Sequence, residues 1–297
     1  MQLLGALRAG CAFVLVSLNT VLHCAVLFMF ALVKLLLPFR PARRAFSRLL
    51  VVIADSWIAC NGMVFALVSR TRWQVEGLDE LSAESSYLVI CNHQSWVDIP
   101  VLQRVLTRRI PFLRFFLKQQ LIWVPLLGLA WWALDFPFMK RYSRQQVERN
   151  PSLRGADMRA TRRACEKFRG LPVSVMNFPE GTRFTPAKHA EQGSRYTHLL
   201  EPKVGGLAFV LGAMGDVLDG IVDVCVVYPS GRPSMLDLFT GRVREIRVQV
   251  RLLPIEVWML AGSYEDDADY RARFRAWVES VWQHKDAQIS AGLPAAA

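Results

Sequence analysis

The sequence predicts an α/β domain with a largely parallel sheet flanked by helices, preceded by an N-terminal apolar helical hairpin. Two observations predict it: after residue 70 β-rich runs alternate with helical patterns, and the first 70 residues form the most apolar part of the chain. Alternating strands and helices are typical of parallel sheets, because the chain returns between parallel strands through a helix that covers the sheet.

Residues 71–297 carry the alternating pattern. Runs rich in β-branched and aromatic residues predict strands at 73–77, 86–91, 173–178, 221–228 and 243–253. Helical periodicity lies between them, at 96–106, 155–168 and 204–214. Near the C-terminus one helical face collects large side chains, which predicts a last helix carrying Tyr270, Phe274, Trp277, Val278, Val281 and Trp282.

Residues 1–70 predict a membrane-anchoring helical hairpin. Residues 11–33 are uncharged, long enough to cross about 30 Å of hydrocarbon, and lack a convincing signal cleavage site. A second apolar stretch at 49–69 is interrupted by Asp55, and an ionised carboxylate at a bilayer centre costs about 2.5–3.5 kcal/mol. We therefore favour a second helix that lies in the interface or one leaflet. Two spanning helices are the alternative.

The charge distribution also indicates a membrane. The net charge is +11, and residues 1–70 hold seven basic residues against one acidic residue. Basic residues gathered around the most apolar segment favour a bilayer with anionic lipids over nucleic acid. The six cysteines form no C-x-x-C pair, so we expect neither a zinc site nor a disulfide framework. This predicts a protein of the inner (cytoplasmic) membrane, with its α/β domain facing the cytoplasm.

Two further segments have interfacial character. Residues 108–118 interleave cations with aromatic side chains, and residues 121–134 are uncharged and include three tryptophans. At about 1.5 Å per residue, the second segment is too short to cross a bilayer. Both patterns fit membrane contact or an apolar groove, and both fit ordinary core equally well.

His93 and Asp98 are the first candidates for chemistry. His93 follows strand 86–91 directly, at the strand end where open α/β sheets place their sites. Five residues along a helix are about 140° apart, so these side chains meet only if His93 lies in the loop and Asp98 in the first helical turn. A carboxylate on one imidazole nitrogen leaves the other as a base. The alternative is a capping box of Ser95 and Asp98.

A second polar cluster follows strand 173–178. It consists of Glu180, Gly181, Thr182 and Arg183. A glycine lets backbone N–H groups approach a ligand closely, and an arginine can hold a phosphate through two parallel hydrogen bonds. The alternative is a surface turn with an incidental ion pair.

Together the two clusters resemble the glycerolipid acyltransferases of the PlsC (lysophosphatidate acyltransferase) family. His-x-x-x-x-Asp and Phe-Pro-Glu-Gly-Thr-Arg, each after a strand, carry the resemblance, which runs from about residue 75 to 230. The run 178–189 is most similar to the branch of YihG-like proteins and lysocardiolipin or lysophosphatidylinositol acyltransferases. Tyr228 departs from the pattern, because smaller residues are common before the last proline. Further matching blocks are Lys118 with Pro125 and Gly128, 138–141, 202–205 and 227–229.

The resemblance implies the glycerolipid acyltransferase fold, with residues 71–297 as the catalytic domain. It implies transfer of a fatty acyl chain from an acyl-CoA or acyl carrier protein thioester to a lysophospholipid, first of all 1-acylglycerol 3-phosphate. His93 would be the general base, oriented by Asp98, and no metal or resident cofactor is expected. The resemblance also implies residues that bind the acceptor phosphate or stabilise the tetrahedral intermediate. They are Glu180, Gly181, Thr182, Arg183, Lys118, Arg141 and Lys203.

Three alternatives stay open. The acceptor could carry another headgroup, of the lysophosphatidylglycerol or lysocardiolipin type. A membrane-bound metal hydrolase could use His93, Asp98 and Glu180, although no third histidine lies near these motifs. The chain could also be a membrane lipid-binding protein without enzymatic activity.

Overall fold

A six-stranded sheet lies at the centre of the structure, a computed structural model that describes residues 2–139, 149, 172–264 and 266–293. Within those residues only the β7–β8 pair is antiparallel, so the largely parallel sheet is confirmed. All five predicted strands are present, and β3 is an additional edge strand. The strand order is β1 (Arg72–Glu76), β8 (Glu245–Leu253), β7 (Gly220–Val227), β2 (Tyr87–Cys91), β6 (Ser174–Asn177) and β3 (Leu113–Phe115).

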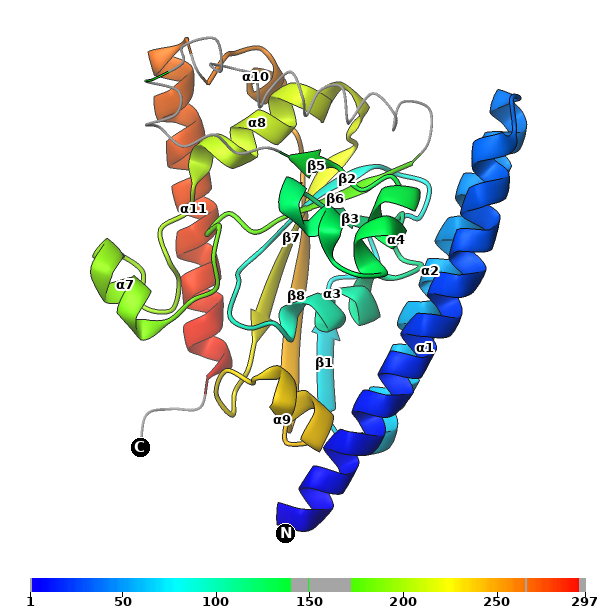
Figure 1. Cartoon of the computed structure of the whole chain (residues 1–297). Coiled ribbons are helices and arrows are strands. Elements are labelled where there is room, and N and C mark those ends of the chain that lie inside the picture. The colour runs from blue at the N-terminus through cyan, green and yellow to red at the C-terminus, as the bar shows by residue number, and fades with distance from the viewer. Residues whose placement is uncertain (1, 140–148, 150–171, 265, 294–297) are drawn as a thin grey trace.

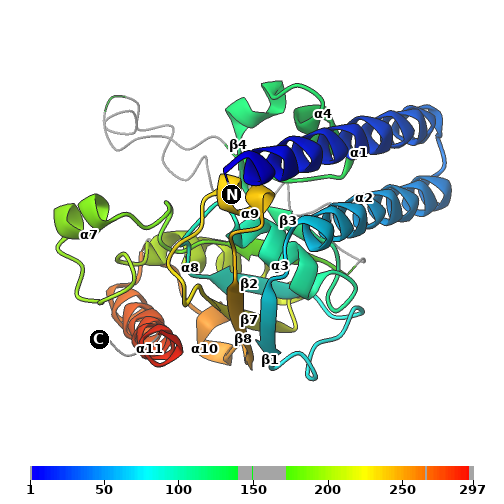
Figure 2. The same cartoon turned by 90° about the horizontal axis from the view of Figure 1, so that it is seen from below.

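Helices cover both faces of the sheet (Figures 1 and 2). Alternate residues of the fully buried strand β2 point to opposite faces: Leu88 and Ile90 pack in a core with α8 (Val204–Met214) and α11 (Ala268–Gly292). Tyr87 and Val89 pack in a second core with α3 (Asp98–Leu106). A strand buried on both sides explains the apolar run of β2 and that of β7, which only Asp223 interrupts.

The predicted helices agree with the structure where it describes them. Helix α8 has the predicted bounds, and α3 begins two residues later than predicted. The expected apolar face of α11 packs into the first core, with Phe274 and Trp282 fully buried and Trp277 partly buried. The helix predicted at 155–168 lies outside the described residues. The shorter elements are β4 (Leu117–Lys118), η1 (Gln119–Trp123), α4 (Leu127–Ala133), β5 (Phe138–Met139), α7 (Pro186–Gln192), η3 (Gly215–Val217), α9 (Met235–Thr240) and α10 (Val257–Leu260).

The two segments with interfacial character differ in their environment. In 108–118, Ile110 and Leu113 are buried, and the chain forms β3, so much of this segment is ordinary core. The segment 121–134 is divided: Ala130 packs with the hairpin, whereas Trp123 is largely exposed. The apolar patch exposed here consists of Trp123, Leu126, Leu129 and Trp132.

Helices α1 (Gln2–Leu36) and α2 (Arg40–Val68) form the predicted hairpin. Both are long and apolar enough to cross a membrane. Their polar side chains pair across the helix interface: Asn19 Nδ2 donates to Asn61 Oδ1 at 2.9 Å, and Trp57 Nε1 donates to Thr20 Oγ1 at 3.0 Å. These bonds satisfy groups that would otherwise face an apolar medium.

The hairpin packs along one side of the α/β domain (Figure 1), and its connecting turn reaches beyond the other elements in Figure 2. Near one end of α1, the Phe13 ring meets the Phe239 ring of α9 with centroids 6.4 Å apart. Near the other end, Lys34 Nζ lies 2.9 Å from the carboxylate of Asp135, just after α4. The division into a hairpin of residues 1–70 and a domain of residues 71–297 stays a prediction.

Candidate active site

The loop between β2 and α3 brings His93 and Asp98 together. His93 lies in the loop and Asp98 is the first residue of α3, as their spacing predicts. The Asp98 Oδ2 atom lies 2.9 Å from His93 Nδ1, and it also accepts the backbone N–H groups of Gln94 and Ser95 at 2.7 and 2.8 Å. The same carboxylate therefore holds the turn and contacts the imidazole, whereas the N-cap of α3 is Val97 and no side chain caps the helix, so the complete capping box is not formed.

Tyr228 bonds the other oxygen of Asp98. Its hydroxyl, at the end of β7, donates to Asp98 Oδ1 at 2.6 Å. Both side chains are buried. Burial raises the pKa of Tyr228 well above its usual value, and the nearby Asp98 charge raises it further. The phenol therefore keeps its proton and remains a donor, and Asp98 is held through both oxygens.

The free edge of the imidazole faces a cavity. The His93 ring stacks on Phe178 with centroids 4.0 Å apart and planes at 16°, which adds a second constraint on its orientation. Among the described residues, no group hydrogen-bonds Nε2, and His93 lines a mainly apolar cavity. With Nδ1 directed to Asp98, Nε2 is the nitrogen that can take a proton from a bound molecule.

Glu180 ties the two motif loops together. Its fully buried carboxyl group accepts the backbone N–H of His93 at 2.6 Å and that of Leu200 at 2.9 Å. Phe184 N donates in turn to the His93 carbonyl at 2.7 Å. Burial raises the pKa of Glu180 to about 8, although the two N–H groups act in the opposite direction. We expected Glu180 to hold the acceptor, but its contacts are those of a group that positions the His93 main chain.

Arg183 lies beside the imidazole loop. Its guanidinium carbon is 4.2 Å from the ring centre of Trp96, which lines the same cavity as His93. Gly181 has φ +68°, and a Cβ there would be 2.9 Å from Lys203 Nζ, so the lysine side chain lies directly over the glycine. Thr182 Oγ1 accepts a hydrogen bond from Lys188 Nζ at 2.6 Å. Arg183 and the side chain of Lys203 therefore both lie next to the turn at Gly181, and their roles in binding stay predictions.

One candidate is not brought to this turn, and another lies outside the described residues. Lys118 is exposed on β4, and no contact among the described residues joins it to His93 or Arg183, although its neighbour Leu117 lines the cavity. Arg141 lies outside the described residues.

Sequence reasoning missed two cations near the site. Lys188 reaches Thr182 from α7, and Arg232 lies 3.8 Å above the Phe184 ring while its Nε donates to the side chain of Gln94. Burial lowers the pKa of Arg232, and the carboxyl group of Glu180 acts against that shift. The available signal for Arg232 was its place in a glycine–arginine–proline turn directly after the predicted strand 221–228.

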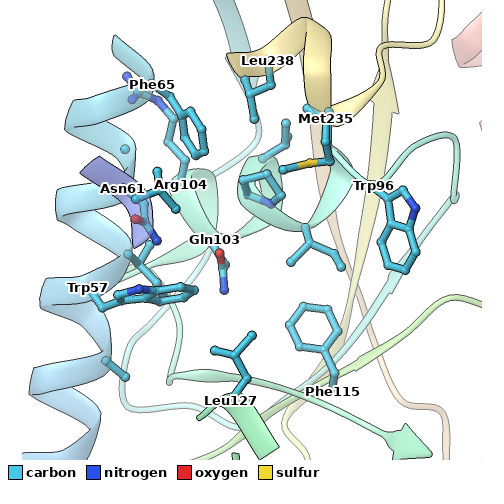
Figure 3. A pocket seen from close by; sticks show the side chains of 18 of the residues that line it. Trp57, Asn61, Phe65, Trp96, Gln103, Arg104, Phe115, Leu127, Met235 and Leu238 are labelled. Atoms are coloured by element: carbon cyan, nitrogen blue, oxygen red, sulfur yellow. The ribbon is translucent and has the colours of Figure 1, made fainter. Parts of the chain in front are cut away.

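The cavity at His93 has a volume of about 740 Å³ and is lined mainly by apolar side chains. Figure 3 shows Trp57 and Phe65 of α2, Gln103 of α3 and Met235 of α9 around it. The hairpin and the α/β domain therefore each supply a wall. The volume falls in the range of about 300–1,000 Å³ that is usual for small-molecule pockets. In the described part of the chain, no group of three or more His, Cys, Asp or Glu side chains could hold a metal ion.

Comparisons with known proteins agree with this geometry. An acyltransferase family model matches residues 72–232. The chain is 26% identical over 286 residues to the probable 1-acyl-sn-glycerol-3-phosphate acyltransferase 5 of Arabidopsis thaliana, covering 93% of this chain and 70% of that protein. It is 25% identical over 252 residues to lysocardiolipin acyltransferase 1 of Gallus gallus, covering 80% and 61% respectively. The chain covers only 51% of the length of another relative that is also named a 1-acyl-sn-glycerol-3-phosphate acyltransferase.

A solved structure has the same fold. The crystal structure of the 1-acyl-sn-glycerophosphate acyltransferase PlsC from Thermotoga maritima superposes with a TM-score of 0.61 at 18% identity, covering 98% of each chain. This confirms the expected fold, including its two apolar N-terminal helices. Because the family model matches more than half of the chain and contains both motif loops, the protein belongs to the acyltransferase family.

Proposed function

We propose that this acyltransferase is membrane-associated and acylates the free hydroxyl of a lysophospholipid, first of all 1-acylglycerol 3-phosphate. The donor is a fatty acyl thioester of coenzyme A or acyl carrier protein, and no resident metal or cofactor takes part. The observation that carries the proposal is the His93–Asp98 pair, whose open imidazole edge lines an apolar cavity beside Arg183. The names of the plant and chicken relatives support this substrate class.

The imidazole performs the proton transfers. His93 Nε2 takes the proton of the acceptor hydroxyl while the hydroxyl oxygen bonds to the thioester carbonyl carbon. Collapse of the tetrahedral intermediate breaks the carbon–sulfur bond, and the imidazolium returns the proton to the departing thiolate. The products are the acylated phospholipid and a free thiol. Asp98 stabilises the imidazolium and keeps Nδ1 protonated, as an orienting carboxylate does.

The cavity supplies the place for the donor's acyl chain. A fatty chain that enters it leaves water for a lining that is mostly apolar, at about 25 cal/mol for each Å² buried. Since His93 lies in the cavity wall, a chain held there brings its thioester carbon to Nε2. Holding both reactants in this way removes most of the entropy barrier to their encounter.

The neighbouring cations favour an acceptor with a phosphate monoester. Arg183 and Lys203 flank the turn at Gly181, with Lys188 and Arg232 nearby. This concentration of positive charge matches the double charge of lysophosphatidate better than the single charge of a phosphodiester headgroup. A lysocardiolipin-type acceptor is the second candidate, because the chicken relative carries that name.

The hairpin geometry supports a position on one leaflet. The contacts at Phe13 and at Lys34 are 21 residues apart on α1, which is about 32 Å of helix. This distance between the two contacts is close to the hydrocarbon thickness of about 30 Å. If α1 crossed the bilayer upright, the attached α/β domain would therefore be drawn into the bilayer. We therefore propose that the hairpin lies in one leaflet of the inner membrane and that the domain faces the cytoplasm, where both thioester donors are found.

An acceptor panel tests the function. Purified protein is assayed with one radiolabelled acyl-CoA and a series of lysolipids, and we expect the highest kcat/KM with lysophosphatidate. Arg183→Gln should raise KM for lysophosphatidate by about 10- to 100-fold, because a charge-assisted hydrogen bond is lost, and leave KM for the acyl donor unchanged. Arg195→Gln is the matched control, since Arg195 pairs with Glu201 and Glu279 and does not contact the site. Failure to acylate any lysolipid would refute the proposal.

A further inference from the structure

We propose that the tip of the hairpin contains a binding site for the phosphate headgroup of an anionic phospholipid, distinct from the active site. This inference deepens the proposed membrane association and rests on it. The occupant is a lipid of the surrounding bilayer that is not acylated, such as phosphatidylglycerol.

A hollow of about 890 Å³ marks the site. It lies where the end of α1 and the first turns of α2 meet the β3 and α4 region of the domain. The hollow does not contain His93 or Arg183. Its lining includes six cations: Lys34, Arg40, Arg43, Arg44, Arg48 and Arg114.

The charge in this hollow is unbalanced. Among the described residues, the only acidic side chain in its lining is that of Asp135, and that carboxylate already pairs with Lys34 at 2.9 Å. The four exposed arginines of α2 have no acidic partner in the part of the chain that the structure describes: Arg40, Arg43, Arg44 and Arg48. Helix α2 begins at Arg40, so the positive end of its dipole points to the same place. A phosphate would meet several guanidinium groups that can bind its oxygens in pairs.

Apolar side chains in the same hollow indicate a lipid rather than a soluble anion. Val51, Val52, Phe112 and Trp132 share the lining with the arginines, and Trp132 is 45% exposed. A free phosphate gains nothing from such a wall, whereas a phospholipid can lay its glycerol and upper chain segments against it. Tryptophan commonly lies at headgroup level in membrane proteins.

The bilayer can reach this hollow. The exposed apolar face of α1 continues to the tip through Leu32 and Leu36, and Phe39 in the connecting turn is also exposed. A lipid bound at the tip would hold the basic turn at headgroup depth and the apolar face of α1 in the chains below. Phe112 lines both the tip hollow and the active-site cavity, so this anchoring would also set the depth of the acyl cavity in the leaflet.

Vesicle binding of the full-length protein tests the site. Affinity is measured for vesicles of phosphatidylcholine and for vesicles that also contain phosphatidylglycerol, and the ratio of the two affinities is compared among variants. The double variant Arg43→Gln/Arg44→Gln should lower this ratio about 25-fold, at about fivefold for each charge. The matched control is Arg8→Gln/Arg70→Gln, which removes the same charge at the other end of the hairpin, and it should lower the ratio clearly less because neither arginine lines the hollow. An equal fall in both double variants would mean diffuse attraction and would overturn the proposal.

Two further measurements separate the site from other outcomes. Trp132→Ala should weaken binding to the phosphatidylglycerol vesicles, and inorganic phosphate at constant ionic strength should not displace the protein from them. Displacement by phosphate together with no effect of Trp132→Ala would mean a site for a free anion and would overturn the lipid assignment. Acyl transfer in neutral detergent should be unchanged in Arg43→Gln/Arg44→Gln. Because binding is measured without acyl transfer, a failure of the proposed function would be seen separately.

Discussion

At the scale of single residues, the Asp98 carboxylate explains why the site holds its shape. One oxygen contacts His93 and two backbone N–H groups, and the other accepts the Tyr228 hydroxyl. A carboxylate with four partners cannot rotate without losing a hydrogen bond in a buried place. The imidazole it orients is therefore ready before substrate binds.

Tyr228 should act as a positioning residue through Asp98. We expect Tyr228→Phe to lower kcat about 10-fold while KM for donor and acceptor stays constant, because a buried carboxylate oxygen loses its partner. The check is steady-state kinetics combined with a double-mutant cycle against Asp98→Asn. The two substitutions should be strongly non-additive, since Tyr228 contacts His93 only through Asp98. Additive losses would contradict this role.

The contacts around the two motif loops, at His93 and at Glu180, were only partly predictable from the sequence. The spacing of His93 and Asp98 required a turn between them, and the structure has it. The position of Glu180 was not predictable, because an acidic residue beside a glycine and an arginine looks like part of a polar surface. Its burial depends on backbone N–H groups of His93 and Leu200, which lie far away in the sequence. Arg232 was missed because its partners, Gln94 and Phe184, also lie far away in the sequence.

At the scale of secondary structure, prediction succeeded where a strand is buried on both faces. Strand β2 is an unbroken apolar run, β7 is one apart from Asp223, and both lie in the middle of the sheet. Strand β3 was missed because it has three residues with Arg114 in the middle. Burial lowers the pKa of Arg114 to about 10, which shows how unusual this position is for a guanidinium. In the sequence, the cations and aromatic residues of 108–118 fitted a membrane interface as well as they fitted ordinary core.

Helix α2 should limit the length of the acyl chain, because it forms one wall of the cavity. Gly62 lines this cavity, and a Cβ there would have only the tip of Arg104 within 4 Å, at 3.9 Å. We expect Gly62→Leu to lower kcat/KM for long-chain donors about 10- to 100-fold relative to short-chain donors. The measurement is a chain-length series of acyl-CoA substrates. Gly10→Leu is the control, since Gly10 lies in α1 outside the cavity with no atom near its Cβ position. A uniform loss at all chain lengths would argue against an acyl cavity here.

At the scale of the whole molecule, the order of the motifs along the chain was sufficient to indicate the family and the fold. The placement of the hairpin was not predictable, because apolar length alone permits both a spanning helix and one lying in a leaflet. That placement depends on contacts between distant residues, such as Lys34 with Asp135 and Phe13 with Phe239. Side chains of the hairpin and of the domain both line the cavity at His93, so its wall is complete only when both parts are present.

The most direct test compares full-length His93→Gln protein with wild type. The rate of acyl transfer to lysophosphatidate is measured for both in phospholipid vesicles. Loss of the general base should lower kcat by about 10²- to 10⁴-fold, while the melting temperature and KM for lysophosphatidate stay close to wild type. A His93→Gln protein whose kcat stays within a few-fold of wild type would contradict the assignment of the imidazole as the base.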